Sequence, residues 1–390
     1  MFLRKLIITA FFILQGNVLS TLGIPSEYIT YILLVIGFFI IIRSRNSFKS
    51  IEWKITLLFL FLLGFRYFTG ILPESFRYAC NLVIPCLVSF ALPNTMSATN
   101  KKIYILAFKL LCLFFAAEII IATYETITHS HLLTWIDSTY ESHLDKIKTR
   151  PIGLVGAPLA SSHILATLSF FILNSPLKQK YKYTLWSINL IGLLLYQGRM
   201  GILFTIIYFI FYMFIELKNR QISIARFTGI MTTICLITII LLSLGLGSRL
   251  FTEDDGGSAD MRLGALTFFD TFSWKNFLIG TPYKNMDIIR ETLGVRIIEM
   301  FILCHFILFG ILFSIFFYIL YIKLYLRIYK NNDKILKVIT IIAFFTLEAT
   351  SISWFSTYEE VTFFLLMAKL LNTTTLILLI PPKYINRNKL

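Results

Sequence analysis

Long apolar runs separated by short charged clusters dominate the chain. About twelve runs of roughly 15–25 residues can each cross a hydrocarbon core of roughly 30 Å, the shorter ones with help from flanking residues. Only helices satisfy their backbone in lipid while remaining this continuously apolar. The pattern therefore predicts an all-α polytopic membrane protein in which residues 1–390 form a single integral membrane domain. The runs fall near residues 6–22, 28–42, 55–71, 79–92, 103–123, 155–173, 185–197, 200–216, 227–247, 296–322, 338–352 and 360–380.

The charges between the runs predict the orientation of the chain. Lys and Arg number 36 against 21 Asp and Glu, which gives a net charge of +15. With the first residues inside, the inner connections hold most of the basic residues and few acids, so both termini are expected in the cytoplasm. Arg4 and Lys5 before the first run also resemble the start of a cleaved signal peptide. That alternative is less favoured, because keeping the first helix preserves the charge alternation throughout.

Composition excludes several other classes of protein. Hydrophobic residues make up 57% of the chain and charged residues 15%, against about 25% charged in an average soluble protein. A soluble enzyme and a nucleic-acid-binding domain are therefore excluded. No GxxxxGK[ST] or GxGxxG motif is present, so no nucleotide cofactor is expected. The five cysteines show no paired spacing, which disfavours a disulfide framework or a CxxC metal site.

Two long connections, residues 124–150 and 248–295, are both predicted to lie outside the cytoplasm, as two large periplasmic loops. The second carries an acidic stretch, Glu253–Asp255, followed by apolar residues at helical spacing that predict a short amphipathic helix at the membrane surface. The acids could bind a divalent cation, and His129 and His131 in the first loop could bind a metal. Solvated loops are the favoured interpretation of both, and no metal site is expected.

Charged residues inside the runs predict a polar cavity. Arg66, Glu118, Glu348 and Lys369 each fall in the middle or outer half of a run, where charges are costly and usually functional or paired. Scattered structural ion pairs are the alternative. The sixth run begins with Pro and Gly at a density that predicts irregular backbone, which must line protein or water. His163 in that run either faces the cavity or has a structural role, and the structural role is the more common one.

Several arginines are expected at the level of the outer headgroups, namely Arg199, Arg262, Arg290 and Arg296. Arginine binds phosphate oxygens bidentately and keeps its charge. A lipid diphosphate that carries a sugar needs no nucleotide, because the diphosphate is itself the leaving group. Arginines would stabilise the departing charge, and a carboxylate or histidine would take the proton of the acceptor hydroxyl.

Three local patches carry a family resemblance. They are Gly156–His163, Gly198–Gly201, and Arg262 followed by aromatic residues and Phe277–Gly280. With its apolar runs and two large outer loops, the chain resembles the superfamily of O-antigen polymerases and O-antigen ligases, in particular the Wzy-type polymerases. The resemblance implies that Arg199 and Arg262 bind undecaprenyl diphosphate.

The resemblance further implies a glycosyltransferase of the bacterial inner membrane that joins undecaprenyl-diphosphate-linked oligosaccharide repeat units at the periplasmic face, in lipopolysaccharide O-antigen or another surface polysaccharide. It implies no cofactor and no nucleic acid, and the partners are membrane lipids, a chain-length regulator and a flippase. The expected catalytic residues are Arg199, Arg262, Glu291 and Glu299, with the general base open between Asp287, Glu291 and Glu299. The expected substrate-binding residues are Arg150, His163, Arg290 and Arg296.

Two alternatives remain. The ligases usually carry a histidine where the last long loop re-enters the membrane. This chain has Arg296 near that place, with His305 deeper in the helix, which makes a ligase less favoured. A flippase for lipid-linked oligosaccharides, or another transporter, is the other alternative. The uneven loops and the absence of a convincing repeat disfavour it.

Overall fold

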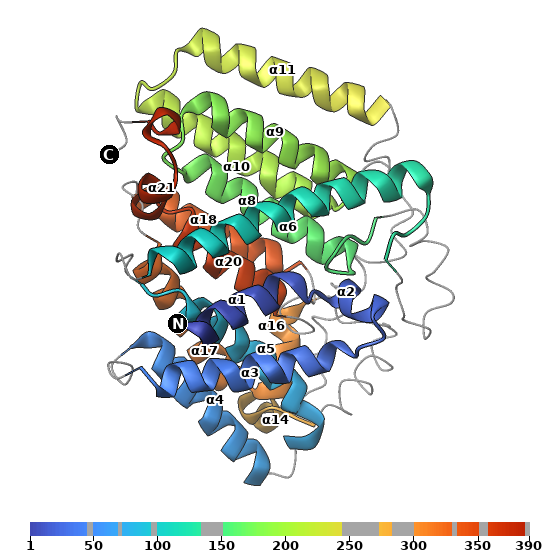
Figure 1. The fold of residues 1–390 in the computed structure, drawn as a ribbon, viewed down its shortest axis with the longest axis vertical. Coiled ribbons are helices and arrows are strands. Elements are labelled where there is room, and N and C mark those ends of the chain that lie inside the picture. Colours follow the sequence, from blue (N-terminus) through green and yellow to red (C-terminus); the bar gives the residue numbers. More distant parts are fainter. Residues whose placement is uncertain are drawn as a thin grey trace.

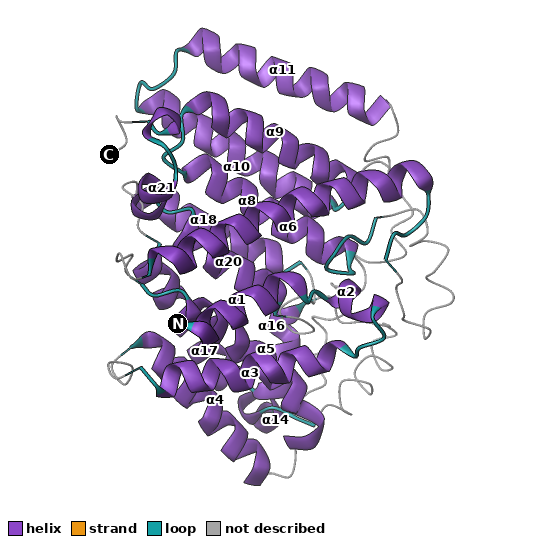
Figure 2. Cartoon of the chain, viewed as in Figure 1, coloured by secondary structure: helices purple, strands orange, loops and turns teal. Residues whose placement is uncertain are grey.

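The computed structural model is a bundle of helices (Figure 1). It describes residues 1–44, 50–68, 72–94, 100–133, 151–243, 273–282, 300–329, 334–350 and 358–386. Within these ranges the chain forms no strand (Figure 2), and one isolated bridge pairs Leu177 with Ile385. The predicted all-α class is confirmed for this part of the chain.

The helices follow the apolar runs closely in the first three quarters of the chain. Their bounds are α1 (Phe2–Ile13), α2 (Gly16–Thr21), α3 (Ser26–Ile42), α4 (Ile51–Phe68), α5 (Leu72–Ala91), α6 (Lys101–Thr128), α8 (Pro158–Asn174), α9 (Gln179–Tyr196), α10 (Arg199–Lys218) and α11 (Ile224–Ser243). The later helices are α14 (Trp274–Ile279), α16 (Phe301–Phe309), α17 (Ile311–Ile328), α18 (Lys334–Glu348), α20 (Glu359–Leu370) and α21 (Thr373–Leu379), and a 3₁₀ turn, η2, covers Pro382–Tyr384.

Several helices can cross a membrane. Within the described ranges α6, α10 and α17 are long and apolar enough, and α20 with α21, bent by 68°, adds a fourth if the pair is one span. Shorter apolar helical stretches cover 28–42, 76–91 and 158–174. Large apolar side chains such as Phe39, Phe61 and Ile120 point outward and are at least 61% exposed. An outer surface this apolar is unusual for a soluble protein, and it indicates a membrane protein.

Three of the predicted runs are broken rather than continuous helices. The first run divides into α1 and α2. The tenth divides at Gly310, whose φ of +81° ends α16 before α17 begins. The last bends between α20 and α21, where the Asn372 side chain accepts a hydrogen bond from the Thr375 N–H at 2.8 Å and starts the second helix. Interruptions of a helix are tolerated at membrane depth where neighbouring helices cover the backbone.

The centre of the bundle is α8. Every residue from Ala160 to Asn174 is buried, and α9, α10, α18 and α20 all pack against this helix. Small and hydroxyl-bearing residues occupy much of it, which lets the surrounding backbones approach closely, as is common between helices in membranes. The helices around α8 therefore fix the position of each of its side chains.

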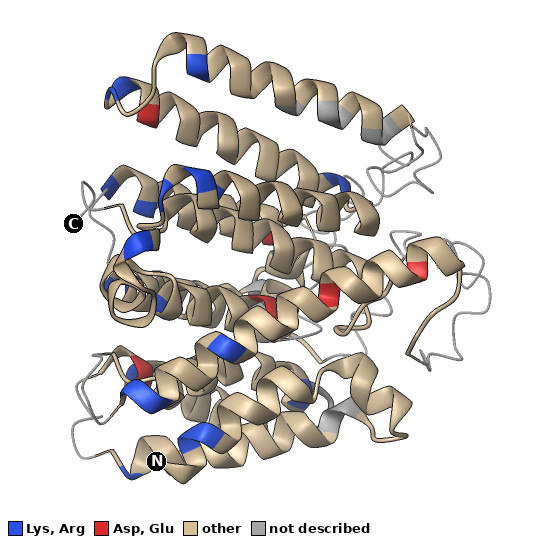
Figure 3. Cartoon of the chain, turned by 45° about the horizontal axis from the view of Figure 1, so that its top comes forward, with Lys and Arg blue, Asp and Glu red and all other residues tan. Residues whose placement is uncertain are grey.

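The two ends of the bundle differ in charge. Both termini lie at one end, and most Lys and Arg of the described residues gather there (Figure 3). We call this the basic end. The chain leaving α8 reaches it, because the Pro176 carbonyl accepts from Asn386 N–H at 2.8 Å and Lys178 N–H donates to Tyr384 at 2.9 Å, both close to the C-terminus. The first residues of α8 consequently lie at the opposite end, as does the start of α10, which follows α9 back across the bundle.

The start of α10 packs closely against α8. A Cβ atom added at Gly198 or at Gly201 would collide with the Oγ of Ser162, and at Gly201 it would also lie 3.1 Å from the Ser162 carbonyl oxygen. Two of the patches identified in the sequence, Gly156–His163 and Gly198–Gly201, therefore meet in the folded chain. Glycine is required at the contact for its small size.

Gly201→Ala should lower the thermal stability of the purified protein in detergent. Overpacking a filled contact destabilises by about 1–3 kcal/mol, and Ser162→Ala, which removes the colliding Oγ, should restore part of the loss in the double variant. Gly64→Ala is the matched control, because nothing lies within 4 Å of a Cβ at that position. If Gly201→Ala unfolds at the same temperature as Gly64→Ala, the close contact is absent.

Candidate functional site

The segment before α8, residues 151–157, runs through the outer part of the bundle without being helical. Gly153 and Gly156 adopt φ angles of +61° and +87°, in the left-handed region that favours glycine. Asn17 of α2 holds the segment from one side. Its side-chain amide donates to the Gly153 carbonyl at 2.8 Å, and its backbone N–H donates to that of Leu154 at 3.2 Å. The predicted irregular backbone is confirmed here.

Glu125 of α6 holds the same segment from the other side. Its Oε2 accepts from the backbone N–H groups of Ile152 at 2.8 Å and Gly153 at 3.3 Å, while its Oε1 accepts from that of Leu132 at 3.1 Å. Burying these N–H groups without hydrogen-bond acceptors would cost free energy of folding. The carboxylate replaces the hydrogen bonds that a helix would have provided.

Glu118 lies two turns earlier on the same face of α6. One oxygen accepts from the Leu154 N–H at 2.8 Å and the other accepts from the Ser161 hydroxyl. The Tyr196 hydroxyl donates to the Glu118 backbone carbonyl at 3.3 Å. Glu118 is 1% exposed, so these contacts are shielded from water. Both carboxylates therefore act on the backbone before α8, and their role in the described contacts is to position it.

His163 and Glu348 form a buried acid–base pair at the outer part of α8. His163 Nδ1 lies 3.3 Å from Glu348 Oε1, and both side chains are fully buried. Glu348 is the last residue of α18, so the pair joins two helices that are far apart in sequence. The full burial of His163 favours a structural role for this residue over direct contact with a substrate in the cavity.

Arg199 lies between the two glycines that contact Ser162, one residue after Gly198 and two residues before Gly201. It is the first residue of α10, it follows the N-cap residue Gly198, and it is partly exposed. The N-terminus of a 20-residue helix carries a partial positive charge and free backbone N–H groups, both of which favour anions. The guanidinium and the helix terminus thus place positive charge close to the start of α8.

The described part of the third sequence patch, Phe277–Gly280, packs elsewhere in the bundle. Helix α14 contacts α16 and α17, and Gly280 and Gly310 approach so closely that a Cβ on either would collide with backbone of the other segment. Arg66, which is 1% exposed, donates to the Thr281 carbonyl at 3.4 Å and has its guanidinium 6.0 Å from the Phe309 ring centroid. This part of the predicted outer loop is therefore packed into the bundle next to a buried arginine.

Of the predicted site residues, the structure describes Arg199 and His163. Ser162, next to His163 in α8, contacts Gly198 and Gly201 on either side of Arg199, and this contact brings the starts of α8 and α10 together. The remaining predicted residues lie outside the described part of the chain, and their assignments stay predictions. They are Arg150, Arg262, Asp287, Arg290, Glu291, Arg296 and Glu299.

One prediction about the charged residues is wrong. Lys369 was expected in the middle or outer half of its run, but its ammonium donates to the carbonyls of Ser89 and Leu92, both at 2.7 Å. These carbonyls end α5, close to the first residues of the chain, where Arg4 lies over the Phe90 ring. Lys369 thus lies at the basic end, because the bend after α20 shortens that helix and a cation there satisfies the last carbonyls of α5.

Other charged side chains are also buried at the basic end. Lys182 donates to the Leu173 carbonyl at the end of α8 at 2.6 Å, and Gln179 donates to Glu216 at 3.2 Å. Glu52 accepts from Asn94 at 3.0 Å and lies 3.5 Å from Arg327. These groups bind helix ends and one another, so they hold the helices together at the basic end.

Comparisons with protein-family models, with curated proteins and with solved structures find no match for this chain.

A double-mutant cycle with Glu348→Gln and His163→Asn should reveal coupling between the two side chains. Groups in direct contact typically couple by about 0.5–3 kcal/mol, so the double variant should lose less stability than the two single losses together. The measurement is the free energy of unfolding in detergent. Losses that add to within about 0.5 kcal/mol would show that the two side chains act independently.

Proposed function

We propose that the protein is a surface-polysaccharide polymerase of the O-antigen type. It transfers a growing glycan from undecaprenyl diphosphate to a new lipid-linked repeat unit at the outer face of the bacterial inner membrane. In this proposal all twelve apolar runs cross the membrane, the basic end faces the cytoplasm, and the two long connections face the periplasm. The gathering of Lys and Arg where both termini lie supports that orientation.

The observation that carries the proposal is the contact between the starts of α8 and α10 at the end of the bundle opposite the basic end. Ser162 packs into the space left by Gly198 and Gly201, and this contact fixes the helix terminus that bears Arg199. A diphosphate at the headgroup level would meet a guanidinium and a helix N-terminus in one place. The resemblance assigns the same arginine to the diphosphate.

The chemistry is a substitution at the anomeric carbon of the donor sugar. A hydroxyl of the acceptor glycan attacks this carbon, the bond to the diphosphate oxygen breaks, and undecaprenyl diphosphate leaves. Arg199, with Arg262, stabilises the charge that develops on the departing oxygen. The proton of the hydroxyl goes to a carboxylate, for which Asp287, Glu291 and Glu299 remain the candidates. Direct attack opposite the diphosphate inverts the configuration of the sugar.

The buried groups around α8 support this chemistry indirectly. Glu118 and Glu125 hold the segment before α8, and the His163–Glu348 pair holds the helix against α18. A catalytic arginine must keep its geometry to within a fraction of an ångström to be effective. We therefore assign these four residues a positioning role and leave direct contact with substrate to the arginines.

Arg199→Ala should abolish the polymer while the protein remains in the membrane. Loss of one donor that stabilises a developing charge lowers such reactions by roughly 10²–10³-fold, and Arg199→Lys should restore only part, because lysine lacks the bidentate geometry. The readout is the lipopolysaccharide ladder on a gel, in a strain from which the gene has been deleted and then restored. Arg226→Ala is the matched control, because Arg226 is an exposed arginine at the start of α11, at the basic end.

The same gel separates the proposed function from its alternatives. In the deletion strain a polymerase leaves core capped by a single repeat unit. Bare core with lipid-linked polymer would indicate a ligase, and bare core with lipid-linked single units retained inside would indicate a flippase. A normal ladder from Arg199→Ala would remove the basis of the proposed site.

A further inference from the structure

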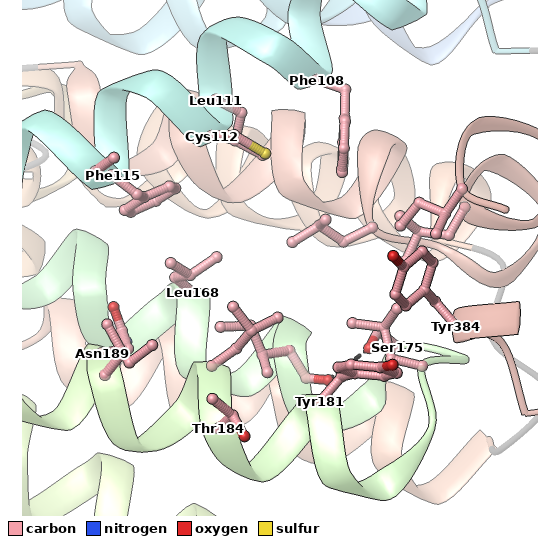
Figure 4. Close-up of a pocket in the computed structure, with 18 of the residues that line it drawn as sticks. Phe108, Leu111, Cys112, Phe115, Leu168, Ser175, Tyr181, Thr184, Asn189 and Tyr384 are labelled. Atoms are coloured by element: carbon pink, nitrogen blue, oxygen red, sulfur yellow. Dashed lines mark hydrogen bonds between the residues drawn. The ribbon is translucent and has the colours of Figure 1, made fainter.

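An apolar pocket opens between helices near the basic end, away from the site proposed above. It has a volume of about 470 Å³ and is lined from α6, α8, α9 and the segment from α20 to η2 (Figure 4). Phe108, Cys112 and Phe115 line it from α6, and Leu168 lines it from α8. Leu185 and Ile188 of α9 line it as well, and both are more than 40% exposed. The pocket is therefore open sideways, toward the surface where lipid would lie.

Two tyrosines line the pocket, and the lysine that precedes each of them in the chain lies over its ring. Tyr181 and Tyr384 line it and meet edge to face with ring centroids 5.0 Å apart. The Lys180 ammonium lies 4.9 Å from the Tyr181 ring centroid, and the Lys383 ammonium lies 4.9 Å from that of Tyr384. Both lysines are exposed. Each of the two aromatic rings that line the pocket thus has a lysine ammonium over it.

A second hollow, of about 420 Å³, is lined by Lys178, Lys383 and Asn386 together with two less polar residues, and Leu177 and Tyr384, the chain neighbours of the two lysines, line the apolar pocket. Backbone hydrogen bonds fix its walls. Lys178 N–H donates to the Tyr384 carbonyl at 2.9 Å, and the bridge between Leu177 and Ile385 lies beside it. The chain after α21 therefore folds back onto the loop between α8 and α9, so that Lys178 and Lys383, from two distant segments, line one hollow.

We propose that this site binds an anionic diacyl phospholipid of the cytoplasmic leaflet. One acyl chain fills the pocket, and the phosphate lies between Lys178, Lys180 and Lys383. Moving an acyl chain from bilayer to an apolar pocket changes its surroundings little, so selectivity must come from the headgroup. Basic pockets between transmembrane helices on the cytoplasmic side select anionic headgroups in this way, and tyrosines are typical of the membrane interface.

The site is independent of the proposed transfer reaction. It lies at the end where both termini gather, whereas Arg199 lies at the opposite end. It also joins α6 and α9 to the last helices of the chain, so a bound lipid would hold together segments that are far apart in sequence. An anionic lipid at this site would stabilise the basic end of the bundle.

The test is lipid binding to the purified full chain, measured by native mass spectrometry with phosphatidylglycerol and phosphatidylcholine of the same acyl chains. The wild type should retain phosphatidylglycerol in preference. Each lysine near an anionic headgroup contributes about fivefold in affinity, so the double variant Lys180→Gln with Lys383→Gln should lose the preference by roughly 20-fold. Lys323→Gln with Lys334→Gln is the matched control, because both lysines are exposed and lie outside the pocket.

A second variant tests the apolar part of the site. Ala116→Trp places an indole in the pocket and should abolish retention of the lipid, whereas Leu113→Trp, at an exposed position of α6 that does not line the pocket, should not. Equal retention of the two phospholipids by the wild type, or an unchanged preference in the Lys180 and Lys383 double variant, would overturn the proposal. Retention of a polyprenyl phosphate in place of phosphatidylglycerol would assign the pocket to a carrier lipid and would also overturn it.

Discussion

Hydrogen bonding of a few backbone amides before α8 is the constraint on which the rest of the bundle depends. The N–H groups of residues 152–154 lie before the first turn of α8 and donate to the carboxyl groups of Glu118 and Glu125. In a membrane no water would replace these acceptors. Two acidic side chains of α6 therefore make it possible for the chain to reach the centre of the bundle in an irregular conformation and to begin its most buried helix there.

The position of α8 in turn fixes the helices around it. Ser162 has room only because Gly198 and Gly201 lack side chains, and His163 meets Glu348 at the end of α18. Arg199 stands at the terminus that this packing holds. The arginine that the resemblance connects with diphosphate binding is thus at a helix terminus whose position depends on contacts from α6, α8 and α18. Preorganisation of a charged group generally requires such a supporting shell.

The fold was more predictable from the sequence than the site. Apolar runs are local signals, so the helices and the irregular start of the sixth run could be read directly. The break at Gly310 and the bend at Asn372 could not, because an apolar run gives no sign of where neighbouring helices will cover a broken backbone. The partners of Glu118 and Glu348 lie 36 and 185 residues away, and Lys369 binds carbonyls 277 and 280 residues away. Only the seven-residue spacing of Glu118 and Glu125, which places both on one face of α6, was a local signal of their common role.

The charged side chains at the two ends of the bundle are held in different ways. Lysines at the basic end lie over tyrosine rings or bind the last carbonyls of helices, as Lys180 and Lys369 do. Lys369 is buried against the carbonyls that end α5, where a cation is stabilised, whereas Lys180 is exposed at the start of α9. Two arginines at the opposite end, Arg199 and Arg66, are partly or fully buried beside glycines, where their planar groups are held by packing. Flexible cations suit the anionic surface of a leaflet, whereas fixed arginines suit a defined phosphate geometry. In the two proposals made above, the charge asymmetry between the ends of the bundle separates a lipid-binding end from an end suited to chemistry on a diphosphate.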